Sequence, residues 1–156
     1  MDNKYVKLHS LLRMLGALLA IIVFVSMFIT KMVVHEEFEA VFWDFNNGAF
    51  FGDANSKGNV FGFIGYILVL LGGLAGLAFV FIDELIGKDL TKTLSYVAGG
   101  VALAGGLLIL LFAPMFLLIN NFNHCTTAAG PIVFGIFGLC VGAINVLAPI
   151  LEEKGK

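Results

Sequence analysis

The chain has 156 residues, of which 60% are hydrophobic and 13% are charged, and its formal net charge is −2. Soluble domains average about 45–50% apolar and about 25% charged residues, so this composition excludes an ordinary water-soluble globule. The mean hydropathy of +1.00 indicates a chain surrounded by lipid. No nucleic-acid-binding signature appears, and we expect no nucleic-acid partner.

Charged residues and His124 divide the chain into four uncharged intervals, each close to or above the roughly 20 residues that a membrane-spanning helix needs. The first interval follows a basic leader, but it is long for a signal peptide and no A-x-A-like site follows it, so we expect an uncleaved span. We predict an all-α integral membrane protein, a compact four-transmembrane-helix bundle in one domain (1–156), with spans at about 11–34, 60–82, 94–119 and 130–151 and outer loops at 35–59 and 120–129.

The distribution of basic residues predicts how these spans face. Four spans place both termini and the connector between spans two and three on one side of the membrane. That side holds seven of the nine basic residues, and basic residues favour the cytoplasmic side. We therefore predict a multi-pass protein of the cell membrane with both termini cytoplasmic. The seven residues are Lys4, Lys7, Arg13, Lys88, Lys92, Lys154 and Lys156.

Small residues recur four positions apart in every span, which indicates close helix packing because lipid supplies no hydrophobic drive for helix association. Chance would produce some of these pairs, and some of the stripes could be reserved for a second protein. The one amide at depth in a span is expected to form a hydrogen bond between helices. The predicted packing residues are Gly16, Gly72, Gly76, Gly100, Gly106, Gly138, Gly142 and Asn145.

Residues suited to catalysis or metal binding are scarce. No acidic or basic residue lies at mid-depth in a span, which disfavours an ion-coupled transporter. Four-span thiol oxidases need paired redox cysteines, and this sequence has no C-x-x-C motif, although it leaves open whether Cys125 pairs with another chain. The segment "HEEFE" does not match the H-E-x-x-H zinc motif, and His124 with Cys125 could complete a site only if the fold joins the two outer loops. We therefore expect no enzyme activity, cofactor or metal.

The first outer loop combines turn residues with large aromatic side chains. Asn46, Asn47 and Gly48 favour a tight turn, and strand-forming residues flank them, so we predict a small β-hairpin across 38–52. Its aromatic residues are candidates for contact with a partner, although they could equally form an interfacial aromatic belt. These candidates are Phe42, Trp43, Phe45, Phe50 and Phe51.

The sequence therefore favours a non-enzymatic multi-pass membrane protein. We expect an accessory, scaffold or assembly factor that acts through its outer aromatic loop and its small-residue helix faces. The alternative is a small oligomeric transporter or channel in which glycine-lined faces form a path for a small or apolar solute. Expected partners are membrane lipid and either a second membrane protein or further copies of this chain.

Overall fold

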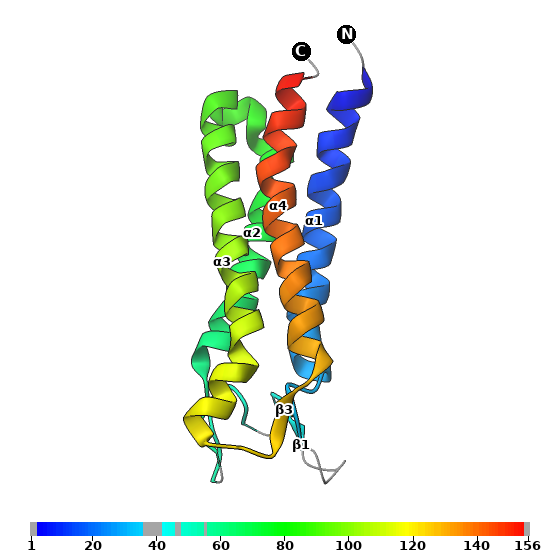
Figure 1. Cartoon of the computed structure of the whole chain (residues 1–156). Helices are drawn as coiled ribbons and strands as arrows, with labels where there is room; N and C mark the ends of the chain where they lie inside the picture. Colours follow the sequence, from blue (N-terminus) through cyan, green and yellow to red (C-terminus); the bar gives the residue numbers. More distant parts are fainter. Residues whose placement is uncertain (1–2, 36–41, 46–47, 55, 155–156) are drawn as a thin grey trace.

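In the computed structural model, four long antiparallel helices carry a small β-sheet at one end (Figure 1). The structure describes the backbone of residues 3–35, 42–45, 48–54 and 56–154. Each helix is long and apolar enough to cross a bilayer. The predicted all-α class is confirmed, and the chain is a multi-pass membrane protein. The helices are α1 (Asn3–Ile29), α2 (Val60–Ile86), α3 (Lys88–Asn120) and α4 (Ala129–Lys154).

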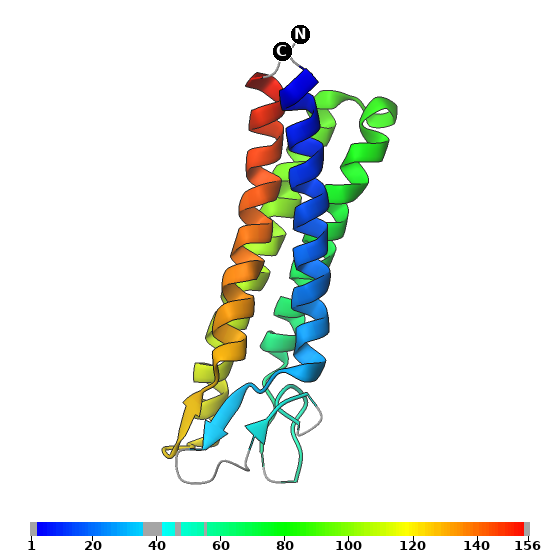
Figure 2. The ribbon, with the colours of Figure 1, turned by 90° about the vertical axis from the view of Figure 1, so that its right-hand side faces the viewer.

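Each helix packs beside its neighbours in sequence, and α4 returns to pack against α1, so the four helices form a closed ring. This is the up-down-up-down arrangement that short connections produce. Both termini lie at one end of the bundle, which we call the terminal end, and the sheet lies at the other, which we call the sheet end (Figures 1 and 2).

The first helix ends earlier than the sequence predicts. We expected span one to continue to residue 34, but α1 stops at Ile29, and the residues that follow Met32 form strand β1 (Val33–His35). The backbone N–H of Thr30 donates to the Ser26 carbonyl at 2.9 Å and closes the last helical turn. The β-branched pair that begins β1 suits a strand better than a helix, which explains why the apolar run changes structure there.

A single glycine joins α2 to α3. Gly87 has φ of 86°, a conformation that favours glycine, and it occupies the N-cap position of α3. The hydroxyl of Thr91 donates to the Gly87 carbonyl at 3.0 Å. Asp89 is not the N-cap, because the helix has already begun at Lys88. Asp89 instead lies in the first turn, where its negative charge complements the helix dipole.

Most of the predicted packing glycines lie where two helix backbones meet. A Cβ atom added to Gly72 would lie 2.7 Å from the Ala98 carbonyl oxygen of α3. One added to Gly106 would lie 2.7 Å from the Leu139 backbone nitrogen of α4. Gly100 is the exception, because it is exposed and nothing lies within 4 Å of such an atom. The other predicted positions that face a neighbouring helix are Gly16, Gly76, Gly138 and Gly142.

Hydrogen bonds from two polar side chains tie three helices together inside the bundle. The side-chain amide of Asn145 donates to the Gly72 carbonyl at 2.9 Å, and the Ser95 hydroxyl donates to the Asn145 carbonyl at 2.8 Å. Gly76 leaves the space that the Asn145 amide occupies, because an added Cβ would collide with that side chain. Bonds of this kind in membrane proteins contribute about 0.6–2 kcal/mol each. Asn145 therefore has a structural role in holding α2, α3 and α4.

Two substitutions on α3 test this packing. Gly106→Ala should destabilise the protein by about 1–3 kcal/mol, because the added methyl group meets the α4 backbone, which cannot move aside locally. Gly100→Ala is the matched control and should be neutral or slightly stabilising, since alanine is the better helix former. Thermal unfolding in detergent measures both. Equal unfolding temperatures for the two variants would show that the α3–α4 contact is looser than described.

Candidate functional site

The two loops at the sheet end are joined by one three-stranded antiparallel sheet. Strand β1 is central, with β2 (Phe42–Trp43) on one side and β3 (Cys125–Thr127) on the other. Val33 pairs with Trp43 in β2 and with Thr127 in β3. Because β3 comes from the loop between α3 and α4, the sheet connects segments that lie far apart in the sequence (Figure 2).

The hairpin that the sequence predicts across residues 38–52 is misplaced. Strand β2 pairs with β1 rather than with the residues after Gly48, and residues 49–51 form a turn. Asn46 and Asn47 lie outside the described residues. Gly48 does adopt a positive φ, 82°, as turn chemistry requires, but the chain then folds back on itself: the Gly52 N–H donates to the Gly48 carbonyl at 2.7 Å. The glycines after β2 therefore build a compact loop rather than a second strand.

Phe50 anchors this loop in the bundle. Its side chain is only 1% exposed and belongs to the hydrophobic core. Its ring stacks on Phe112 of α3 with centres 4.9 Å apart, and meets Tyr66 of α2 edge-on at 5.9 Å. Burying an aromatic side chain in this way contributes about 1.5–3 kcal/mol, and favourable ring geometry adds about 0.5–1.5 kcal/mol. Phe50 was a candidate for partner contact, but in this structure it closes the sheet end of the bundle.

The other aromatic candidates divide into supporting and exposed residues. Phe45 is half-buried and contacts the rings of Phe28 and Phe50, at 4.8 and 5.8 Å. Phe51 is 61% exposed and rests on Phe63, with ring centres 5.1 Å apart. The side chains of Phe42 and Trp43 lie outside the described part of the chain. Among the candidates whose side chains are described, Phe51 is therefore the exposed one, and Phe63 supports its ring.

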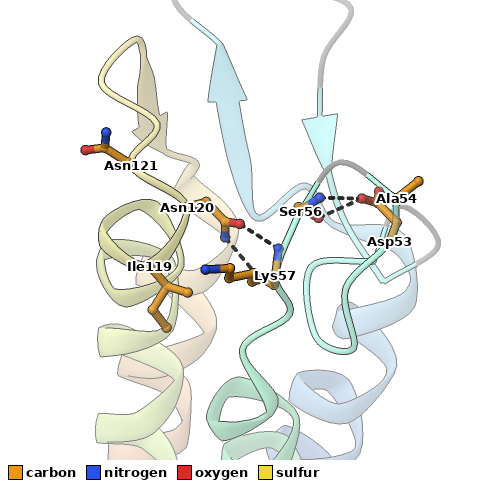
Figure 3. Close-up of a pocket in the computed structure, with 7 residues that line it drawn as sticks. All are labelled: Asp53, Ala54, Ser56, Lys57, Ile119, Asn120 and Asn121. Carbon is orange, nitrogen blue, oxygen red and sulfur yellow. Dashed lines mark hydrogen bonds between the residues drawn. The ribbon is translucent and has the colours of Figure 1, made fainter.

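A polar cleft of about 460 Å³ lies between the loop that precedes α2 and the end of α3 (Figure 3). Asn120 bridges its two walls: the Lys57 N–H donates to the Asn120 side-chain oxygen at 2.6 Å, and the Asn120 amide donates to the Lys57 carbonyl at 2.9 Å. That amide also donates to the Phe116 carbonyl within α3. The lining residues are Asp53, Ala54, Ser56, Lys57, Ile119, Asn120 and Asn121.

A hydrogen-bonded turn forms one wall of this cleft. The Asp53 carboxylate accepts hydrogen bonds from the backbone N–H and the hydroxyl of Ser56, at 2.7 and 3.0 Å, and so holds the turn. The described lining contains no histidine or cysteine. Asp53 and Lys57 are both exposed, so the described lining presents one acidic and one basic side chain to solvent.

A second cavity, of about 320 Å³, is lined by His35 from the loop after α1 and by His124 and Cys125 from the loop after α3. His35 lies opposite Cys125 in the β1–β3 pairing, and its ring centre is 6.3 Å from that of His124. The fold thus joins the two outer loops, as a metal site there would require. Among the described residues, however, no group of three or more His, Cys, Asp or Glu side chains is arranged to hold a metal ion.

Two important polar residues escaped the sequence analysis. Asn59 caps α2 by accepting a hydrogen bond from the Phe61 N–H at 3.2 Å, while its amide donates to the Phe112 carbonyl, also at 3.2 Å. An asparagine just before an apolar run is a known N-cap signal and could have been recognised. Arg13 was counted only as one of the basic residues that set the orientation, but its side chain is 1% exposed, because it shares a helix face with Gly16 and Ala17.

Comparison with protein-family models, with curated proteins and with solved structures gives no significant match. The function therefore has to be inferred from the geometry of the sheet end and from the packing of the bundle.

Replacing Asn120 tests how the loop is held. Asn120→Ala removes the two hydrogen bonds that join Lys57 to α3, each with a net contribution of about 0.5–1.5 kcal/mol, and should loosen residues 52–58 without unfolding the helices. The Lys57 amide should exchange its hydrogen at least about tenfold faster, since 1.4 kcal/mol corresponds to a factor of ten. Asn123→Ala, in an exposed turn of the other loop, is the control. Unchanged exchange in Asn120→Ala would contradict the bridging role.

Proposed function

We propose that this protein is a non-enzymatic accessory or scaffold protein of the cell membrane, which binds a second membrane protein through its sheet end. The observation that carries this proposal is the firm seating of the sheet end on the bundle. Phe50 is buried between Tyr66 and Phe112, and the sheet joins both loops. A surface held in this way is preorganised, so a partner has little ordering cost to overcome.

The proposed contact surface consists of Phe51 and the polar cleft whose lining begins two residues later, at Asp53. An aromatic side chain surrounded by polar groups is the usual composition of a binding hot spot. Phe51 supplies the exposed apolar ring, and Asp53 and Lys57 supply opposite charges that could fix the orientation of a partner. Phe45 and Phe63 support the Phe51 ring, with centres 6.2 and 5.1 Å away. This surface replaces the broader aromatic set that the sequence indicates.

The packing of the glycines favours this role over transport. A channel or transporter built from glycine-lined faces needs those faces to line a path between copies. Here Gly72, Gly106 and most of the others are in contact with neighbouring helices of the same chain, and Gly100 alone of the predicted set faces outward. The small-residue faces are therefore occupied within one chain, which leaves the sheet end as the surface available to a partner.

Photo-crosslinking in native membranes tests the contact surface. A photoreactive phenylalanine analogue at position 51 should give a discrete protein adduct, because Phe51 faces the proposed partner. The same analogue at Leu118, an 80% exposed residue near the sheet end of α3, should give lipid adducts and serves as the control. Phe51→Ala should reduce the amount of the crosslinked protein that co-purifies, while membrane levels stay normal. Lipid adducts at both positions would identify Phe51 as part of an aromatic belt instead.

The proposal also places the sheet end outside the cell and both termini in the cytoplasm, in accord with the distribution of basic residues. Cysteine labelling tests this in a background with Cys125→Ser and Cys140→Ser. A membrane-impermeant maleimide should label the exposed position Ala54→Cys in intact cells, and should label the exposed position Lys88→Cys only after permeabilisation. The reverse pattern would show that the sheet end is cytoplasmic.

A further inference from the structure

Pro149 interrupts the backbone hydrogen bonding of α4 near the terminal end. In an α-helix the N–H of each residue donates to the carbonyl four residues earlier, and proline has no N–H. Pro149 therefore leaves the Asn145 carbonyl without its helical donor. Both residues are buried, and Asn145 is only 1% exposed. Inside a membrane protein, where water does not reach, such a carbonyl has to accept a hydrogen bond from another group.

The Ser95 hydroxyl of α3 supplies the missing donor. It donates to the Asn145 carbonyl at 2.8 Å, and Ser95 is fully buried. A serine side chain is one of the groups that satisfy the backbone freed by proline in membrane helices. The Asn145 side chain is held separately, since its amide donates to the Gly72 carbonyl of α2. The bond to Ser95 therefore takes the place of the helical bond that Pro149 removes.

Beyond Pro149, the last residues of α4 meet α3 through charged and exposed groups. The Lys92 ammonium pairs with the Glu153 carboxylate, and the two side chains are 36% and 53% exposed. A small cleft of about 30 Å³, lined mainly by charged residues, lies between the beginning of α3 and the end of α4. Exposed ion pairs contribute little net stability. The end of α4 is therefore held less firmly than its middle, where a Cβ added to Gly142 would lie 2.8 Å from the Leu103 nitrogen of α3.

We propose that α4 contains a hinge at residues 145–149, which the Ser95 hydroxyl holds closed, and that the segment after it, residues 150–154, opens and closes against α3. A helix bends most readily at proline, where one hydrogen bond is missing and the ring crowds the preceding turn. Opening would break the ion pair with α3 and widen the charged cleft beside Pro149. Because the hinge lies at the terminal end, this inference does not depend on partner binding at the sheet end.

A double-mutant cycle tests whether Ser95 replaces the missing helical bond. Ser95→Ala should lower the ratio of folded to unfolded protein in mixed detergent micelles at least about threefold, because it leaves the Asn145 carbonyl without a donor. In Pro149→Ala the new backbone N–H can donate to that carbonyl, so adding Ser95→Ala should lower the ratio less than about 1.5-fold. An equal loss in both backgrounds would overturn the role assigned to Ser95.

The control for this cycle is Thr93→Ala. The Thr93 hydroxyl is exposed and donates to the Asp89 carbonyl within α3, so its loss should have the same effect in both backgrounds.

Hydrogen exchange of the full-length protein in detergent tests the motion itself. Ser95→Ala should speed exchange of the amides of residues 150–153 at least about threefold and leave those of residues 138–144 unchanged, because only the segment beyond the hinge gains freedom. Thr93→Ala should change neither group. No acceleration in Ser95→Ala, or an equal acceleration along the whole of α4, would show that the helix has no hinge at this position.

Discussion

The close approach that glycine allows between neighbouring helices is the constraint on which this structure depends. Lipid offers no hydrophobic drive for one apolar helix to join another, so contact between backbones and the hydrogen bonds across them have to hold the bundle. At Gly72 and Gly106 an added Cβ would come within 3 Å of the facing helix backbone. The same approach lets the Asn145 amide reach the Gly72 carbonyl. A bundle held in this way has its small residues facing inward and larger apolar residues facing lipid.

This inward packing determines which surfaces of the protein are left for contact with other molecules. The described helices meet one another along the faces that a solute path would have required, and Phe50 occupies the sheet end among aromatic rings from α2 and α3. The surfaces left free of helix packing are the two ends of the bundle, and of these the sheet end carries the β-sheet. The three-stranded sheet gives this surface a backbone framework that short loops alone would lack, because each strand contributes hydrogen bonds that the others satisfy.

At the sheet end the chain changes from the helix of span one to the central strand of the sheet. Only Thr30 and Lys31 interrupt the apolar sequence between Met27 and β1, yet the helix stops at Ile29 and Val33 enters the centre of the sheet, fully buried. Ordering two loops on one central strand places His35 beside Cys125 and brings His124 within reach of His35. The loop that carries Phe51 and the loop after α3 thus belong to one folded unit, which the sheet joins.

The sequence by itself determined the number of spans and the helical class, because these follow from a local property, the length of apolar runs. The four-residue spacing of small residues also indicated some of the glycines that face a neighbouring helix, such as Gly72 and Gly106. The sequence also indicated a turn at Gly48, because glycine tolerates the positive φ that this turn requires.

Only the tertiary structure decided which side chains meet across the chain. Periodicity cannot tell that Gly100 faces outward while Gly106 faces α4, because both belong to helical stripes that differ only in rotation about the axis of α3. Nor can it tell that β2 pairs with β1 instead of with the residues after Gly48, since strand propensity names no partner. Phe50 and Phe51 are adjacent and chemically identical, yet one is 1% and the other 61% exposed, because the turn points them in different directions. The burial of Arg13 and the meeting of His35 with His124 arise in the same way, from contacts between segments that local sequence does not specify.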